Sequence, residues 1–172
     1  RVFVRPTDFH PLRTANPDLR IQFSDLYDEL TADETRNRAI CEDVMQAVRE
    51  DRSPVVLTER NEHLDCLARR LSPNIRHAIV LRGGMRRKEL AAVAARLAAI
   101  PEGDERVLLA TGRYLGEGFD DARLDTLFLT LPVSWRGTIA QYVGRLHRLH
   151  DRKREVRVYD YADLSVPMLA RM

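Results

Sequence analysis

The sequence of 172 residues has few cysteines, no long apolar run and almost no excess charge. Its two cysteines, Cys41 and Cys66, lie in stretches with helical patterns and have no paired spacing. This excludes a disulfide-rich secreted scaffold and favours a reducing, cytoplasmic setting. Because no C-x-x-C pair occurs, we also expect no metal site. The longest apolar stretch, Leu90 to Ile100, contains Arg96 and is far shorter than the roughly 20 residues of a membrane-spanning helix.

The formal net charge of +2 is too small to attract a polyanion by itself. Any such attraction has to come from a local arrangement of charges. The chain is 44% hydrophobic and 31% charged, and its length suits one domain with a sizeable core. Its first residue is Arg1 rather than methionine, and we expect it to be part of a longer protein.

Short apolar runs alternate with amphipathic stretches along most of the chain. Strands are predicted at Arg1 to Thr7, Val55 to Thr58, His77 to Leu81, Val107 to Ala110, Thr126 to Leu131 and Glu155 to Tyr161. Helices are predicted from near Ala32 to Glu50 and at Asn61 to Leu71, Arg86 to Ile100 and Thr138 to Leu149. This alternation predicts an α/β fold, a three-layer open sandwich whose mainly parallel sheet is covered on both faces.

The start of the first long helix has a sequence signature of its own. Thr31 and Glu34, three residues apart, form a capping-box pattern. The segment from Asp8 to Arg20 contains several prolines and predicts a loop or an irregular connection.

One glycine-rich stretch follows a predicted strand directly. ATGRYLGEGFD, Ala110 to Asp120, holds three glycines, an arginine and two carboxylates. In parallel sheets, ligands bind beyond the carboxyl ends of the strands. Glycines let the backbone approach a phosphate or ribose closely, and a carboxylate accepts hydrogen bonds from a sugar hydroxyl or water. A glycine-rich turn without a ligand explains the composition equally well.

The octet QYVGRLHR lies in a predicted helix after the next strand. Helical spacing predicts two stripes: a polar one of Gln141, Arg145 and Arg148, and an apolar one of Tyr142, Leu146 and Leu149. Forked guanidinium donors suit phosphate oxygens, so the polar stripe indicates a phosphate site, with a solvated basic helix as the alternative. Gly144 inside a helix costs about 1 kcal/mol relative to alanine, which favours a close contact there with backbone or ligand.

Four stretches occur in the order PVVLTER, LRGG, ATGRYLGEGFD and QYVGRLHR, between about Pro54 and Asp160. In this order and on these elements they resemble motifs IV, IVa, V and VI of superfamily 2 helicases and translocases, in the second RecA-like domain. The forms E-G-F-D and Q-x-x-G-R-x-x-R resemble the restriction-enzyme and excision-repair type of the DEAD/DEAH group. The resemblance implies that residues 53–172 form a RecA-like helicase C-terminal domain. It implies that residues 1–52 form an interdomain linker and leading helix, within a single compact unit.

The resemblance also implies three groups of site residues. It identifies Arg145 and Arg148 as arginine fingers for the γ-phosphate, with Gln141 near the phosphate or the attacking water. The nucleotide-facing positions that it implies are Glu117, Gly118 and Asp120. The positions that it implies for the nucleic-acid backbone are Thr58, Arg60, Arg82, Gly83, Thr111 and Arg113.

Two motifs of an ATPase are missing from the sequence. There is no phosphate cradle of the form G-x-x-x-x-G-K-[ST] and no acidic D-E-x-[DH] box for Mg²⁺. In the family that the chain resembles, these lie on a preceding N-terminal RecA-like domain. We therefore expect this chain to supply half of a site for ATP and Mg²⁺, to act on DNA or RNA, and to be nearly inactive alone. A non-catalytic α/β module that binds nucleic acid or protein is the alternative.

Overall fold

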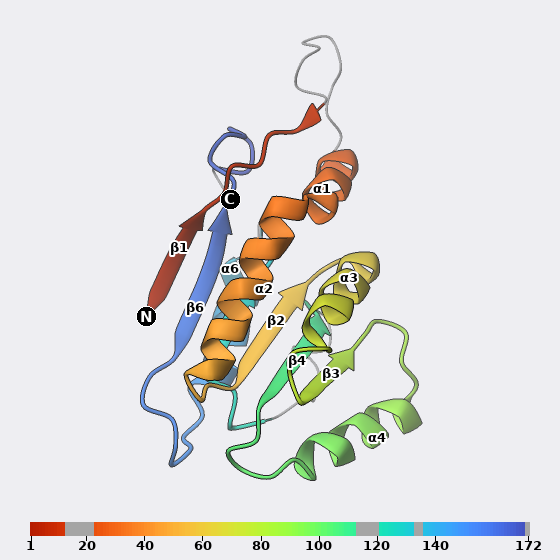
Figure 1. Cartoon of the computed structure of the whole chain (residues 1–172), viewed down its shortest axis with the longest axis vertical. Helices are drawn as coiled ribbons and strands as arrows, with labels where there is room; N and C mark the ends of the chain where they lie inside the picture. The colour runs from red at the N-terminus through yellow and green to blue at the C-terminus, as the bar shows by residue number, and fades with distance from the viewer. Residues whose placement is uncertain (13–22, 113–120, 133–135, 171–172) are drawn as a thin grey trace.

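A computed structural model of the chain describes residues 1–12, 23–112, 121–132 and 136–170. The strands are β1 (Val2–Pro6), β2 (Pro54–Thr58), β3 (His77–Leu81), β4 (Arg106–Thr111), β5 (Thr126–Leu129) and β6 (Arg157–Ala162). The helices are α1 (Phe23–Ala32), α2 (Glu34–Arg49), α3 (Asn61–Leu71), α4 (Arg87–Ala98) and α6 (Arg136–Leu146). The strands pair in parallel throughout, in the order β1-β6-β5-β2-β4-β3. Figure 1 labels β1, β6, β2, β4 and β3 of this sheet. The predicted α/β sandwich is confirmed.

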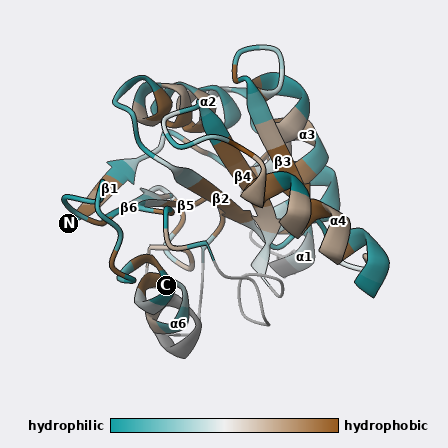
Figure 2. Ribbon diagram, turned by 90° about the horizontal axis from the view of Figure 1, so that it is seen from below, coloured by the Kyte–Doolittle hydropathy of each residue, from teal (hydrophilic) through white to brown (hydrophobic). Residues whose placement is uncertain are grey.

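The central strands are buried on both faces. In β2, Val55 and Leu57 belong to the core that packs against α4 and α6, whereas Val56 belongs to the core that packs against α2 and α3. Alternation along a strand sends successive side chains to opposite faces, so each short apolar run contributes to two cores. Figure 2 shows these strands in brown, with α2 and α3 on one side of the sheet and α6 on the other.

The first part of the chain contains one helix more than expected. α1 precedes α2, and Asp33 between them caps α2 by accepting a hydrogen bond from the backbone nitrogen of Arg36 at 2.7 Å. The predicted capping role of Thr31 is wrong, because its hydroxyl donates to the Asp28 carbonyl within α1. No helix in the described residues is long and apolar enough to cross a membrane.

The last helix ends earlier than its spacing predicts. α6 ends at Leu146, and the ammonium group of Lys153 donates to the carbonyls of Leu146 and Arg148 at 2.8 and 2.9 Å. This lysine satisfies carbonyls that a helix end leaves without partners. Tyr142 and Leu146 are buried as predicted. Leu149 is 97% exposed, so its place in the apolar stripe is wrong.

The N-terminal strand is part of the main sheet. β1 pairs with β6 in register from Val2 opposite Val158 to Pro6 opposite Ala162. This confirms the strand predicted at the start of the chain. The irregular connection predicted after it lies partly outside the described residues, and the linker role of residues 1–52 stays a prediction.

A buried arginine joins the carboxyl ends of several elements. Arg36 of α2 is 2% exposed, and its guanidinium donates to both carboxylate oxygens of Asp163, at 3.0 and 3.3 Å, and to the Thr130 carbonyl. The Thr7 hydroxyl also donates to Asp163. Thr7 follows β1, Thr130 follows β5 and Asp163 follows β6. The ion pair between Arg36 and Asp163, with its hydrogen bonds to Thr130 and Thr7, therefore fixes three strand ends against α2.

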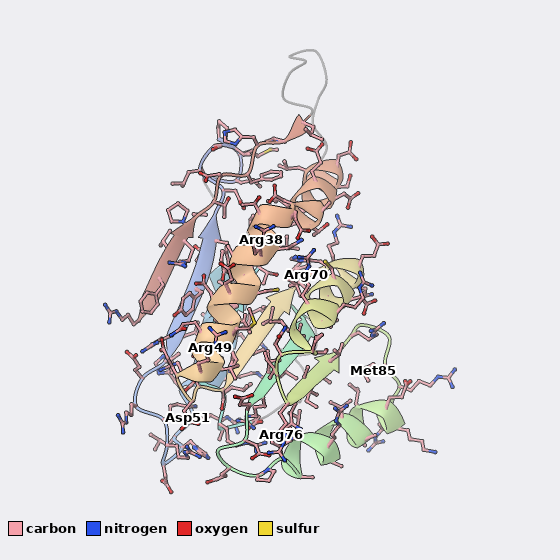
Figure 3. The ribbon with its side chains drawn as sticks, in the orientation of Figure 1. Arg38, Arg49, Asp51, Arg70, Arg76 and Met85 are labelled. Carbon is pink, nitrogen blue, oxygen red and sulfur yellow. The ribbon has the colours of Figure 1, made fainter. Side chains whose placement is uncertain are left out.

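Arg36→Ala should lower the free energy of unfolding by about 3–5 kcal/mol, because it leaves Asp163 buried without its cation. Urea unfolding of the chain measures this. Arg70→Ala is the matched control, since Arg70 on α3 pairs with Glu34 in an exposed position (Figure 3) and should matter much less. Equal losses in the free energy of unfolding would show that the buried ion pair of Arg36 matters no more than the exposed pair of Arg70.

Candidate nucleotide and nucleic-acid site

The connections of the chain diverge between β2 and β5, and we call this point the junction of the sheet. These two strands are neighbours in the sheet. The chain leaves β2 for α3 on one face and passes from β5 to α6 on the other face. Ligands of open α/β sheets bind where the connections of adjacent strands diverge in this way, beyond the carboxyl ends. The sheet therefore places its candidate site at the ends of β2, β5 and the adjoining β4.

Three residues from different strand ends meet at this edge. Thr58 of β2 lies opposite Thr111 of β4, and β3 ends two residues before Gly83. A Cβ built on Gly83 would lie 3.8 Å from Thr111 Oγ1 and 3.9 Å from Asn61 Oδ1. The Thr111 hydroxyl is buried and forms no hydrogen bond within the described residues. The polar side chains of Thr111 and Asn61 thus both lie next to Gly83.

Asn61 is not among the site residues that the resemblance implied. It is exposed, and it is the first residue of α3. Its position directly after PVVLTER was the available signal. A polar residue that opens a helix at the carboxyl edge of a parallel sheet is placed to meet a ligand there.

Thr58 is 1% exposed and takes part in a buried chain of hydrogen bonds. His63 lies between Thr58 Oγ1, 3.0 Å from its Nδ1, and Asn37 Oδ1, 2.8 Å from its Nε2. The Asn37 amide nitrogen donates to the Thr31 carbonyl, so its oxygen accepts from Nε2–H of the neutral ring. Nδ1 then accepts the Thr58 proton. Thr58 therefore supports the loop after β2 through buried hydrogen bonds. Its hydroxyl oxygen also accepts a hydrogen bond from the backbone nitrogen of Arg60 at 3.4 Å.

The pH dependence of stability tests this arrangement of His63. Burial, with smaller contributions from Arg36 and Arg70, lowers the pKa of His63 from 6.5 to about 3. Below pH 6.5 the unfolded chain binds a proton at this residue that the folded chain does not bind, so acid destabilises the fold. Between pH 7 and pH 5, His63 should account for a loss of about 2 kcal/mol in the free energy of unfolding.

Urea unfolding of His63→Gln at the two pH values measures this contribution. His63→Gln should remove that part of the pH dependence, and His147→Gln, at an exposed histidine, should keep it. A wild-type pH dependence in His63→Gln would contradict the buried neutral ring.

Arg60 and Arg82 lie near the same edge and face carboxylates. Arg82 forms an ion pair with Asp65 of α3. Arg60 lies 3.9 Å from Asp28 of α1, with its guanidinium 6.0 Å from the centre of the Tyr27 ring. Ion pairs in such exposed positions contribute little free energy, so an incoming phosphate can compete for either arginine.

The polar stripe of QYVGRLHR is only partly helical. Gln141 is exposed and Arg145 half-buried, four residues apart on α6. Arg148 lies beyond the helix end, where its backbone nitrogen donates to the Arg145 carbonyl at 3.4 Å. The helical position predicted for Arg148 is wrong because Lys153 binds the carbonyls where α6 ends. The phosphate-binding roles of the three side chains stay predictions.

Within the described residues, Gly112 rather than Gly144 makes a close approach. A Cβ on Gly144 would meet no described atom within 4 Å apart from its chain neighbours and the backbone of its own helix, so a contact there with a ligand stays a prediction. A Cβ on Gly112, in contrast, would lie 2.8 Å from the hydroxyl oxygen of Tyr142. That hydroxyl donates to the Gly112 carbonyl at 2.6 Å. The spacing of the octet identified Tyr142 as a packing residue and gave no signal of this bond.

Four predicted positions follow β4 in the sequence. Arg113, Glu117, Gly118 and Asp120 lie outside the described residues, so the nucleotide-facing group stays a prediction. Within the described ranges, no group of three or more histidine, cysteine, aspartate or glutamate residues is arranged to hold a metal ion.

No family model and no curated protein matches the sequence. Solved structures match most of the chain. T4 UvsW matches with a TM-score of 0.71 and 19% identity over 94% of this chain and 31% of its own. The C-terminal part of the Fun30 ATPase domain matches with a TM-score of 0.69 and 14% identity over 84% of this chain and 46% of its own. Domain 2 of the DEAD-box helicase Mss116p, bound to an RNA duplex, matches with a TM-score of 0.54 and 11% identity over 73% of this chain and 50% of its own.

These likenesses define the class of the fold. The chain has the RecA-like α/β fold of these structures, and the predicted fold class is confirmed. It spans about a third of the T4 UvsW chain and just under half of the Fun30 chain.

Proposed function

We propose that this chain is the C-terminal RecA-like motor domain of an ATP-dependent superfamily 2 helicase or translocase. The observation that carries the proposal is that the start of the candidate motif V stretch is bonded to the candidate motif VI helix beyond the carboxyl end of β4. Gly112 of the first stretch and Tyr142 of the second are joined by a hydrogen bond there. The likeness to T4 UvsW and to the Fun30 ATPase domain supports the same reading.

In this proposal the edge of the sheet binds the backbone of DNA or RNA. The Thr111 hydroxyl and the Gly83 and Asn61 positions would contact phosphate or sugar, with Arg60 and Arg82 adding positive charge. Arg113 would extend the same surface. Thr58 would hold the loop in place through His63, because its own hydroxyl proton is committed to that ring. Contacts of this kind bind nucleic acid without reading its sequence.

The α6 side of the site would face ATP. Arg145 and Arg148 would stabilise the charge that develops on the γ-phosphate, and Gln141 would orient the phosphate or the attacking water. Glu117, Gly118 and Asp120 would line the same cleft. Guanidinium and amide donors suit phosphate oxygens, and the Mg²⁺ ligands and phosphate cradle would come from an N-terminal RecA-like domain of the same protein. Closure of the two domains around ATP would then move them along the nucleic acid.

In the complete gene product, Arg145→Ala should lower the turnover number for ATP at least about a hundredfold, because a guanidinium that acts on the transition state is lost. The dissociation constant of a fluorescent ATP analogue should change little. Arg38→Ala, at an exposed arginine of α2 (Figure 3), is the matched control and should turn over ATP normally. Normal turnover in Arg145→Ala would reject the finger assignment.

A further inference from the structure

One buried hydroxyl links the two halves of the proposed site. Tyr142 is 4% exposed, and its ring packs in the core between the sheet and α6. The hydroxyl reaches the carbonyl of Gly112, which directly follows Thr111 at the nucleic-acid edge. Along α6, Tyr142 is next to Gln141 and one helical turn before Arg145. The bond therefore runs from the residues proposed for nucleic acid to the residues proposed for phosphate.

The fit around this bond leaves little room for adjustment. A side chain on residue 112 would place its Cβ 2.8 Å from the Tyr142 oxygen, closer than Cβ contacts occur in proteins. The same Cβ would lie 3.8 Å from Cζ of the ring, an ordinary contact distance. Packed cores transmit small displacements because they have no free volume to absorb them. A shift of the Gly112 carbonyl is therefore felt by the tyrosine and by the helix that carries it.

The chemistry of the hydroxyl keeps the bond in place. Burial, and to a smaller degree the carboxylate of Glu59, raises the pKa of Tyr142. The hydroxyl therefore stays protonated at neutral pH and remains a donor. A carbonyl oxygen can only accept, so the pair has a fixed direction.

We propose that Tyr142 is a positioning residue that makes ATP turnover depend on bound nucleic acid. Nucleic acid bound at Thr111 would fix the position of the Gly112 carbonyl. Through its hydrogen bond to this carbonyl, Tyr142 would then position Gln141 and Arg145 on α6. The inference rests on the proposed function and adds to it the route by which one ligand acts on the other.

The test compares ATP turnover of the complete gene product with and without saturating poly(dT), and separately poly(U). Tyr142→Phe removes one oxygen and keeps the ring. Basal turnover should stay within twofold of wild type, whereas stimulation by the polymer should fall at least about fivefold, the scale of one hydrogen bond. A purely structural role would lower both turnovers together. Tyr161→Phe is the matched control, because that buried hydroxyl donates to Asp43 on the α2 face and should leave stimulation unchanged.

A second variant tests the same bond from its other end. Gly112→Ala should push the tyrosine hydroxyl away and lose stimulation to a similar degree. In the Tyr142→Phe background the added methyl has room, so Gly112→Ala should cause little further loss. Additive losses would overturn the proposal.

The outcomes separate this inference from the proposed function. Full stimulation in Tyr142→Phe, with wild type stimulated as well, overturns the inference and leaves the proposed function standing. A wild-type gene product that does not hydrolyse ATP with either polymer rejects the proposed function, and the inference with it.

Discussion

Parallel pairing of β2 with both β4 and β5 is the constraint on which the rest of the structure depends. It brings the ends of three strands to one edge, although the residues concerned lie far apart in the sequence. The chain leaves β2 and β5 toward opposite faces of the sheet. The connections that follow these two neighbouring strands therefore diverge at this edge. This pairing positions the proposed nucleic-acid residues. It also positions the bond between Gly112 and Tyr142 and the helix that carries Arg145.

Buried polar groups stabilise the strand ends and the loop that form this edge. Arg36 joins the ends of three strands through Thr130 and through Asp163, which also accepts from Thr7. His63 holds the loop after β2 through Thr58. Groups of this kind are costly to bury unless every donor and acceptor is satisfied, so they fix one arrangement rather than many. Under the proposed function this edge binds a polyanion and responds to it, and a rigid support favours both.

Much of the fold could be predicted from the sequence because short apolar runs and helical spacing are local signals. Strands such as β2 and β3 lie where the pattern of Val, Ile and Leu placed them. The end of α6 could not be predicted, since it depends on Lys153, seven residues beyond Leu146. The bond from Tyr142 to Gly112 joins residues 30 apart, and no local pattern records it. The motif order indicated the neighbourhood of the site, but its internal contacts depend on tertiary packing.

ATP hydrolysis by the 172-residue chain alone, beside the complete gene product, tests the central claim most directly. If this chain supplies half of a shared site, it should show no turnover above background at any concentration of Mg²⁺ or nucleic acid. The complete gene product should hydrolyse ATP under the same conditions. Comparable turnover by the chain alone would contradict the shared site, because the phosphate cradle and metal ligands would then have to lie within these residues.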